Sequence, residues 1–330
     1  MKMLIDMHCD TISELQYRGG EENLVHNTLC VNMERMRQAE IWIQYFACFV
    51  NVGKYERELQ SGQGTTGAAW EMAWQEALHL IKRLWREESD RIQIIGSCSE
   101  AEEIGSQKIA AFPTVEEGGV LNGRVERLEE LYQKGVRLLT LTWNYENCIG
   151  YPNSRSVKFM RQGLKPFGFE VVERMNELGM IIDVSHLSDG GFWDCIQKSK
   201  VPIVASHSNT RALCDHPRNL SDEMLRALAE KGGVAGLNFY PAFLKEKGRV
   251  TTADIARHAK YMIETAGEDV VAIGTDFDGF EIGIKKGYIS HPGETELVWE
   301  SCKKAGITER QLDKIRWQNA WRVMKDILYL

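Results

Sequence analysis

The chain alternates short, uniformly apolar runs with longer segments of helical periodicity, and this alternation limits its possible folds more than any other feature. Eight apolar runs, each followed by a helical pattern, span residues 3–7, 41–50, 109–115, 136–142, 180–184, 201–205, 234–239 and 270–274. Strands that are apolar on both faces are typical of parallel sheets covered by helices. Eight such units predict an α/β fold of the (β/α)8 (TIM) barrel type rather than a doubly wound sheet. The absence of a glycine-rich phosphate loop after the first run agrees with this choice.

Two further segments refine this outline. Residues 91–95 form a short additional strand pattern, and the stretch from Ser99 begins a helix with a serine N-cap and early acidic residues. Residues 143–164 form a long loop rich in Asn, Gly and Ser, and long loops at strand ends are often functional. No Pro/Ser-rich linker interrupts the chain, so we expect a single barrel catalytic domain over residues 1–330.

Composition excludes several classes of partner. The formal net charge of -7, without a basic cluster, argues against nucleic acid or an anionic membrane and favours a small molecule. The eight cysteines form no close pairs, which excludes zinc ribbons and iron–sulfur clusters and fits a reducing compartment. The longest uncharged apolar run, 41–50, is too short to span a membrane, and Lys2 and Asp6 flank the first run. We therefore expect a cytoplasmic protein without a signal peptide.

Side chains that can bind metal ions follow the apolar runs, at the strand ends where barrel active sites assemble. These residues are His8, Asp10, Glu117, His186, His207 and Asp276. His8 and Asp10 are two apart on an extended segment, so both project to one face and can hold one cation. Each residue alone also has a structural interpretation, as a loop cap or a turn acid, and Glu116 is an alternative to Glu117. Their shared position after the strands favours one site.

These ligands are more than one catalytic zinc ion needs, and a carboxylate among them can bridge two ions. Paired divalent ions about 3.5–4 Å apart share a hydroxide whose pKa falls to about 7, and they polarise a substrate oxygen. The pattern therefore predicts two metal ions and hydrolysis of a polarised acyl bond.

Seven segments, in this order along nearly the whole chain, resemble the renal (membrane) dipeptidase family of two-zinc peptidases, in a bacterial form without an anchor. They are His8–Thr11, Val115–Gly119, Leu139–Thr142, Leu178–His186, Ala205–Ser208, Pro217–Asn219 and Gly274–Gly279. The resemblance implies that His8 and Asp10 hold one Zn2+, that His186 and His207 hold the other, and that Glu117 bridges them. The family also suggests a homodimer.

The resemblance further implies roles in catalysis and substrate binding. Asp276 handles the proton of the bridging water, and Arg218 and Tyr240 hold the substrate. Many family members have a histidine after the Leu-Thr-Leu-Thr run that helps to bind the substrate carbonyl; this chain has Trp143, followed by Asn144. Both are expected at the substrate, and the replacement bears on efficiency and substrate range rather than on the metal site.

We therefore expect a zinc metallodipeptidase that hydrolyses dipeptides with a free C-terminal carboxylate through a hydroxide bridging two zinc ions. A bidentate pairing of Arg218 with that carboxylate would explain a preference for dipeptides. One alternative is a barrel metallohydrolase acting on a lactone, a cyclic amide or a phosphoester, which Arg218 argues against. The other is a metal-binding barrel without turnover, which an activity screen distinguishes.

Overall fold

The computed structural model describes residues 3–59, 67–281 and 288–328. Its strands are β1 Leu4–Cys9, β2 Ile41–Phe49, β3 Ile92–Ile94, β4 Ile109–Glu116, β5 Leu138–Thr140, β6 Ile181–Asp183, β7 Val204–Ala205, β8 Val234–Leu237 and β9 Val271–Ile273. Its α-helices are α1 Thr11–Arg18, α2 Met33–Gln38, α3 Val52–Leu59, α4 Gly67–Trp85, α5 Cys98–Ile104, α6 Glu126–Gln133, α7 Val157–Met160, α8 Pro166–Leu178, α9 Asp189–Lys198, α10 Asp222–Glu230, α11 Pro241–Leu244, α12 Thr252–Ala266, α13 Glu296–Lys304, α14 Glu309–Asp313 and α15 Asn319–Leu328. Short 3-10 turns lie at Gly118–Leu121 and Pro292–Glu294, and a π-helical segment, Lys314–Gln318, leads into α15.

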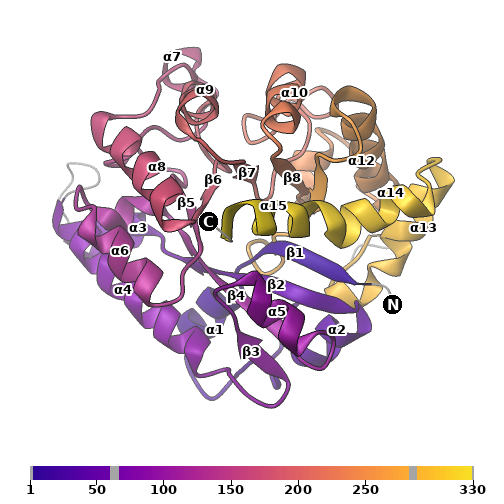
Figure 1. The fold of residues 1–330 in the computed structure, drawn as a ribbon, viewed down its shortest axis with the longest axis horizontal. Helices are drawn as coiled ribbons and strands as arrows, with labels where there is room; N and C mark the ends of the chain where they lie inside the picture. The colour runs from indigo at the N-terminus through magenta and orange to yellow at the C-terminus, as the bar shows by residue number, and fades with distance from the viewer. Residues whose placement is uncertain (1–2, 60–66, 282–287, 329–330) are drawn as a thin grey trace.

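The strands form a closed parallel barrel. Their order is β2-β1-β9-β8-β7-β6-β5-β4, and β2 pairs with β4 to close the ring. Each of the eight predicted apolar runs supplies one barrel strand, and the helices form an outer layer around them (Figure 1). The additional strand expected at 91–95 is present as β3, which pairs with β4 outside the ring. The (β/α)8 prediction is confirmed.

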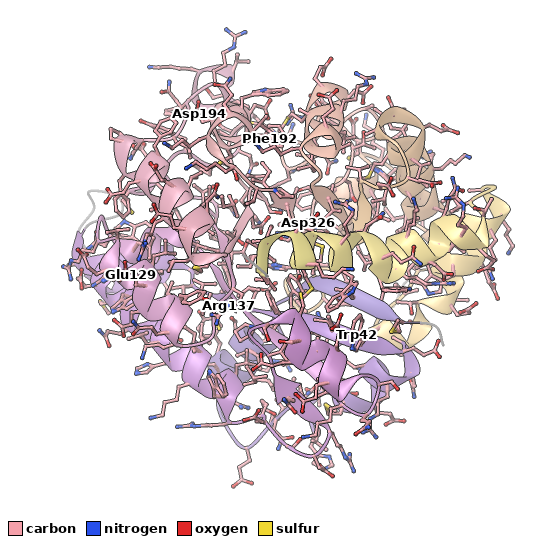
Figure 2. The ribbon with its side chains drawn as sticks, viewed as in Figure 1. Trp42, Glu129, Arg137, Phe192, Asp194 and Asp326 are labelled. Atoms are coloured by element: carbon pink, nitrogen blue, oxygen red, sulfur yellow. The ribbon has the colours of Figure 1, made fainter. Side chains whose placement is uncertain are left out.

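The barrel interior is filled by side chains from all eight strands. One buried cluster contains Ile5 and Met7 of β1, Phe112 of β4 and at least one residue from each other barrel strand, together with residues of α15. Helix α15 crosses the amino-terminal end of the barrel, where the Trp321 ring lies 4.6 Å from the Trp42 ring (Figures 1 and 2). This end is closed by apolar packing, which leaves the carboxyl-terminal end for chemistry.

The inward and outward alternation of side chains along β1 is interrupted near the end of the strand. Ile5 and Met7 point into the barrel, so strict alternation would turn His8 outward. The pairing of β1 with β2 shifts register between Asp6 and Cys9, and such irregularities re-aim side chains next to active sites. His8 therefore lies on the inner side, while Cys9 packs in the outer core.

The structure differs from the sequence-based outline at several places. The N-cap of α5 is Ser97, whose hydroxyl accepts a hydrogen bond from Glu100 N, and Ser99 lies inside the helix. Helices α1 and α3 were not expected, and α7 lies within the predicted loop 143–164. These helices are short, so few turns carry the periodicity that identifies a helix. Among the described residues, no helix is both long and apolar enough to cross a membrane.

Candidate metal centre and substrate cavity

Three histidines and three carboxylates meet at the carboxyl-terminal end of the barrel. Glu116 ends β4, His8 lies near the end of β1, and the others lie just after β1, β6, β7 and β9: Asp10, His186, His207 and Asp276. Parallel strands bring these positions together although up to 268 positions separate them in sequence. All but Asp276 are buried, and Asp276 is half-buried.

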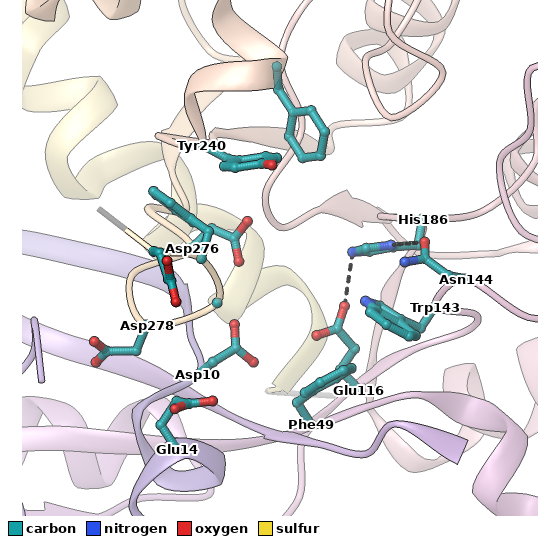
Figure 3. A pocket seen from close by; sticks show the side chains of 14 residues that line it. Asp10, Glu14, Phe49, Glu116, Trp143, Asn144, His186, Tyr240, Asp276 and Asp278 are labelled. Carbon is teal, nitrogen blue, oxygen red and sulfur yellow. Dashed lines mark hydrogen bonds and ion pairs between the residues drawn. The ribbon is translucent and has the colours of Figure 1, made fainter. Parts of the chain in front are cut away.

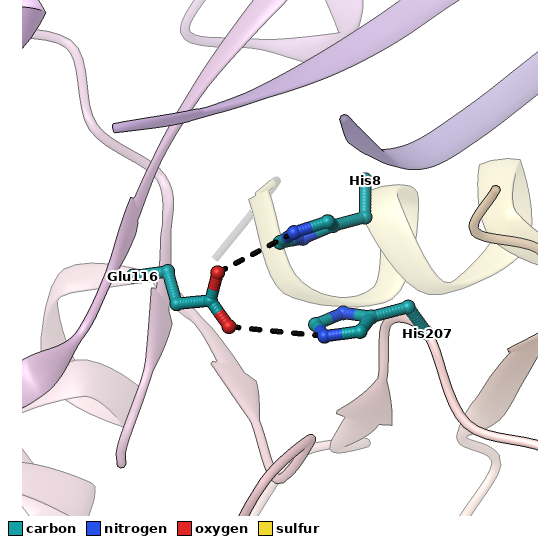
Figure 4. Close-up of side chains that lie close together, drawn as sticks. All are labelled: His8, Glu116 and His207. Atoms are coloured by element: carbon teal, nitrogen blue, oxygen red, sulfur yellow. Dashed lines mark ion pairs between the residues drawn. The ribbon is translucent and has the colours of Figure 1, made fainter. Parts of the chain in front are cut away.

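The two oxygens of the Glu116 carboxylate face different partners. Oε2 lies 3.4 Å from His8 Nε2, whereas Oε1 lies 3.1 Å from His186 Nε2 and 3.7 Å from His207 Nε2. Figure 4 shows the carboxylate between His8 and His207, and Figure 3 shows its contact with His186. One carboxylate thus joins two groups of nitrogen ligands.

Two further carboxylates lie beside His8. His8 Nε2 lies 3.5 Å from Asp10 Oδ2 and 3.8 Å from Asp276 Oδ1. Two overlapping sets of ligand atoms are close enough to share a metal ion: His8, Glu116 and His207, and His8, Asp10 and Asp276. The arrangement can therefore hold metal ions, and His8 belongs to both sets.

Several of these buried atoms lack any hydrogen-bond partner among the described residues. They are His8 Nε2, Asp10 Oδ1 and Glu116 Oε1. Burial raises the pKa of Asp10 to about 7 and lowers the pKa of His186 to about 4, both toward the neutral forms. A divalent cation offsets this cost, because it binds carboxylate oxygens and neutral imidazole nitrogens directly. The residues present fit a metal centre.

Glu117, the bridging ligand expected from the sequence, lies outside this cluster. Its carboxylate is fully buried and accepts hydrogen bonds from Gly119 N at 2.8 Å, Asn147 Nδ2 at 3.0 Å and Trp143 N at 3.2 Å. Burial raises its pKa to about 7. Glu117 thus caps the turn after β4 and ties it to the loop after β5, and Glu116 takes the position among the imidazoles.

The alternation along β4 contains a signal that distinguishes these two acids. Ala110 and Phe112 point into the barrel, so residues of the same parity face inward and Glu116 follows them. Glu117 has the opposite parity and lies where the chain has left the strand. The Glu-Gly-Gly motif draws attention to Glu117, but the pleat of the strand decides which carboxylate reaches the three imidazoles.

Backbone strain concentrates at the same strand ends. His186, Asp276 and Asp278 have φ angles of 67°, 64° and 68°, in the left-handed region that non-glycine residues rarely adopt. Among the described residues only two other non-glycine positions share this feature, Glu40 and Asn122. Such strain persists where the surrounding structure enforces it and is common at functional sites.

A cavity of about 450 Å3 opens beside the ligand cluster (Figure 3). The aromatic part of its lining consists of Phe49, Trp143, Tyr240, Phe243 and Phe280. Trp143 packs edge-on against Phe49 at 4.8 Å, and Asn144 beside it places Oδ1 3.3 Å from His186 Nδ1. The structure therefore places Trp143, Asn144 and Tyr240 in the lining of the cavity.

Acidic residues lie on the side of the cavity away from Trp143 (Figure 3). Besides Asp10 and Asp276, they are Glu14 and Asp278. Glu281 also lines the cavity, and neither Glu14 nor Glu281 was singled out from sequence. Asp278 is anchored by Thr11 Oγ1 at 2.7 Å and by the backbone N–H of Cys30 at 2.7 Å. This wall favours a cationic group on the substrate.

Arg218 lies behind His207 and is not part of the cavity lining formed by the described residues. Its guanidinium donates to His207 O and to Ser208 Oγ, both at 3.2 Å, and packs over the Phe243 ring. Its Nε is buried without a hydrogen-bond partner among the described residues. Burial lowers the pKa of Arg218 to about 10, so the side chain remains cationic at neutral pH.

Residues 1–329 match the family model of the membrane dipeptidases, peptidase family M19. The chain belongs to this family. An uncharacterized protein of Klebsiella pneumoniae is 35% identical over 268 residues, which cover 78% of this chain and 96% of that protein. An uncharacterized dipeptidase of Schizosaccharomyces pombe is 29% identical over 89% of this chain and 71% of its own length.

Solved structures agree with the fold of the M19 family member described here. The crystal structure of a metallopeptidase named dipeptidase AC matches with a TM-score of 0.88 at 23% identity, over 100% of both chains. A metallopeptidase from Rhodobacter sphaeroides, solved with a phosphinate mimic of the dipeptide L-Ala-D-Ala, matches with a TM-score of 0.84 at 24% identity. That match covers 98% of this chain and 99% of the other.

Proposed function

We propose that this M19 family member is a zinc dipeptidase that hydrolyses dipeptides with a free C-terminal carboxylate. The observation that carries the proposal is the Glu116 carboxylate, whose two oxygens face two separate groups of ligand atoms. In this assignment His8, Asp10 and Glu116 Oε2 would hold one zinc ion. His186, His207 and Glu116 Oε1 would hold the other, so Glu116 would take the role expected of Glu117.

Two divalent ions held in this way would supply an activated water at neutral pH and polarise the scissile carbonyl. The protein supplies the proton carrier, for which Asp276 is our candidate. Its Oδ2 accepts a hydrogen bond from Asn238 Nδ2 at 2.9 Å, which leaves Oδ1 directed toward His8 and the ligand cluster. Burial raises the pKa of Asp276, which suits a group that accepts a proton from the water and passes it to the departing amine.

Arg218 is our candidate for binding the substrate carboxylate. A buried guanidinium with an unpartnered Nε is costly unless an anion pairs with it, and a C-terminal carboxylate can accept two hydrogen bonds from it. Phe243 lines the cavity and contacts both the guanidinium and the Tyr240 ring, so Arg218 lies next to the cavity. The dipeptide mimic bound by the Rhodobacter sphaeroides relative supports a substrate of this size.

Trp143 and Asn144 would border the substrate on the opposite side. The indole N–H can donate a hydrogen bond but cannot carry a proton, unlike the histidine that many family members have here. Asn144 contacts His186 Nδ1 and thereby orients a proposed zinc ligand. We expect this wall to select substrates by shape and apolar contact.

A dipeptide library with L,L and L,D members, assayed on protein whose metal content is measured in the same sample, tests the proposal. We expect zinc close to two ions per chain and turnover that disappears when the metal is removed and returns when zinc is added. Blocked dipeptide amides serve as the matched control and should be poor substrates. Full activity with one ion per chain would refute the two-metal assignment, and turnover only of lactones, cyclic amides or phosphoesters would refute the dipeptidase assignment.

A further inference from the structure

A buried aspartate that is not a metal-ligand candidate organises one half of the metal centre. Asp183, the last residue of β6, is fully buried and accepts four hydrogen bonds. Its Oδ1 accepts from the backbone N–H of Ser185 at 2.9 Å and of Ser206 at 2.8 Å. Its Oδ2 accepts from Thr140 Oγ1 at 2.7 Å and Ser206 Oγ at 2.6 Å. One carboxylate therefore ties together the ends of β5, β6 and β7.

The Ser206 hydroxyl connects this carboxylate to an imidazole. Ser206 Oγ lies 2.6 Å from Asp183 Oδ2 and 2.7 Å from His207 Nδ1. A hydroxyl has one hydrogen to donate, and a carboxylate can only accept. Ser206 therefore donates to Asp183 and accepts from His207, so the proton of the neutral imidazole lies on Nδ1.

This tautomer leaves His207 Nε2 with a free lone pair. Nε2 lies 3.0 Å from His186 Nε2 and 3.7 Å from Glu116 Oε1. His186 Nδ1 faces the amide oxygen of Asn144, which accepts a hydrogen bond and directs the second imidazole in the same way. Two imidazole nitrogens bound to one tetrahedral zinc ion lie roughly 3.3 Å apart, given Zn–N bonds of about 2.0 Å. The observed spacing matches two nitrogens prepared for one cation.

The half of the site around His8 has no such connection among the residues that the structure describes. Asp6 is buried in β1 and accepts from Thr275 N at 2.9 Å and Thr275 Oγ1 at 2.7 Å, but its contact with His8 is to the backbone N–H. It ties β1 to β9 without touching the His8 ring. Among the described ligand candidates, His207 is the one whose ring is linked to a carboxylate through a hydroxyl group.

We propose that Asp183 and Ser206 are positioning residues that set the tautomer of His207 and thereby strengthen zinc binding in the half-site of His186 and His207. The inference rests on the proposed metal centre. The hydrogen bonds from His207 through Ser206 to Asp183 transfer no proton during the reaction. They hold the imidazole ring of His207 in place and keep its Nε2 unprotonated. Such outer contacts of metal ligands typically change metal affinity by about 10- to 100-fold.

The test compares Ser206→Ala with Thr140→Val in the zinc-loaded enzyme, titrated with a chromophoric chelator. Both variants remove one hydrogen bond to Asp183 Oδ2, but only the first disconnects His207. We expect Ser206→Ala to bind one of its two ions about 10- to 100-fold more weakly, so that the chelator removes this ion at a correspondingly lower concentration. The affinity for the second ion should be unchanged. Thr140→Val should match it in lost folding stability while its zinc affinity stays within about threefold. Ser206→Thr keeps the hydroxyl and should restore the affinity.

A tautomer measurement keeps the inference testable if a variant fails to fold. Nitrogen-15 NMR of the unmutated zinc enzyme should show His207 with its proton on Nδ1 and Nε2 bound to metal. A proton on Nε2, equal zinc release by Ser206→Ala and the unmutated enzyme, or equal weakening by Thr140→Val would each overturn the inference. Failure of the unmutated enzyme to bind zinc would refute the proposed function instead. Zinc binding without dipeptide turnover would refute the proposed activity and leave this inference standing.

Discussion

Glu116 and Glu117 are adjacent, chemically identical and both buried, so the same substitution at each separates a metal ligand from a structural acid. In Glu117→Gln, one of the two carboxylate oxygens becomes an N–H group that faces the donors Gly119 N, Asn147 Nδ2 or Trp143 N. Leaving a buried donor unsatisfied costs about 1–3 kcal/mol. We expect Glu117→Gln to lower the free energy of unfolding by about that amount and to retain both metal ions.

Glu116→Gln should give the opposite pattern. Its carboxylate faces the imidazole nitrogens of His8, His186 and His207 rather than backbone and amide donors, so metal binding is the property that separates the two variants. As the proposed bridge, however, Glu116 contacts both groups of ligands. Loss of a residue that only contacts a metal ligand weakens metal binding by up to about 100-fold, and loss of Glu116 should weaken it by more. We expect the purified variant to hold at most one ion per chain.

The two variants are compared by urea denaturation of the metal-free proteins and by metal analysis of the zinc-loaded ones. Dipeptide hydrolysis is measured at saturating zinc to separate weak binding from lost chemistry. A Glu116→Gln protein that keeps two tightly bound ions, or a Glu117→Gln protein that loses one, would refute the assignment of Glu116.

Four further outcomes are expected. Arg218→Ala should raise KM for free-acid dipeptides by roughly 10- to 150-fold, as loss of a charged hydrogen bond of about 1.5–3 kcal/mol implies, and should abolish discrimination against dipeptide amides; unchanged discrimination would contradict its role. Asp276→Asn should retain both ions while kcat falls by about two orders of magnitude or more, whereas loss of an ion would identify Asp276 as a ligand. Glu14→Gln should lower kcat/KM for dipeptides with an N-terminal lysine by about two- to fivefold relative to methionine; an equal effect on both would argue against the acidic wall. Burial lowers the pKa of His258 to about 4, so the unfolded chain binds a proton near pH 6.5 before the folded chain does, and stability falls as pH drops below about 6.5. At pH 5 the neutral His258 lowers the free energy of unfolding by about 2 kcal/mol. In His258→Gln, the difference in unfolding free energy between pH 7 and pH 5 should therefore be smaller by about this amount.

The sequence alone was sufficient to identify the barrel, because eight apolar runs separated by helices have few other ways to bury both faces of their strands. It also located most of the ligand candidates. His186 and His207 each lie two residues after the end of an apolar run, and the carboxyl ends of parallel strands necessarily meet at one end of a barrel. Strand boundaries were less accurate, since hydrogen bonding to neighbouring strands sets them; β7, for example, spans only Val204–Ala205.

The tertiary structure decided where side chains point. The choice between Glu116 and Glu117 depends on the pleat of β4, and the inward direction of His8 depends on a register shift in β1 against β2. The acidic wall joins Glu14 to Asp278, which are 264 positions apart in sequence and meet only when the barrel closes. Apolar periodicity is a property of one segment, whereas side-chain direction at a strand end follows from pairing with its neighbours.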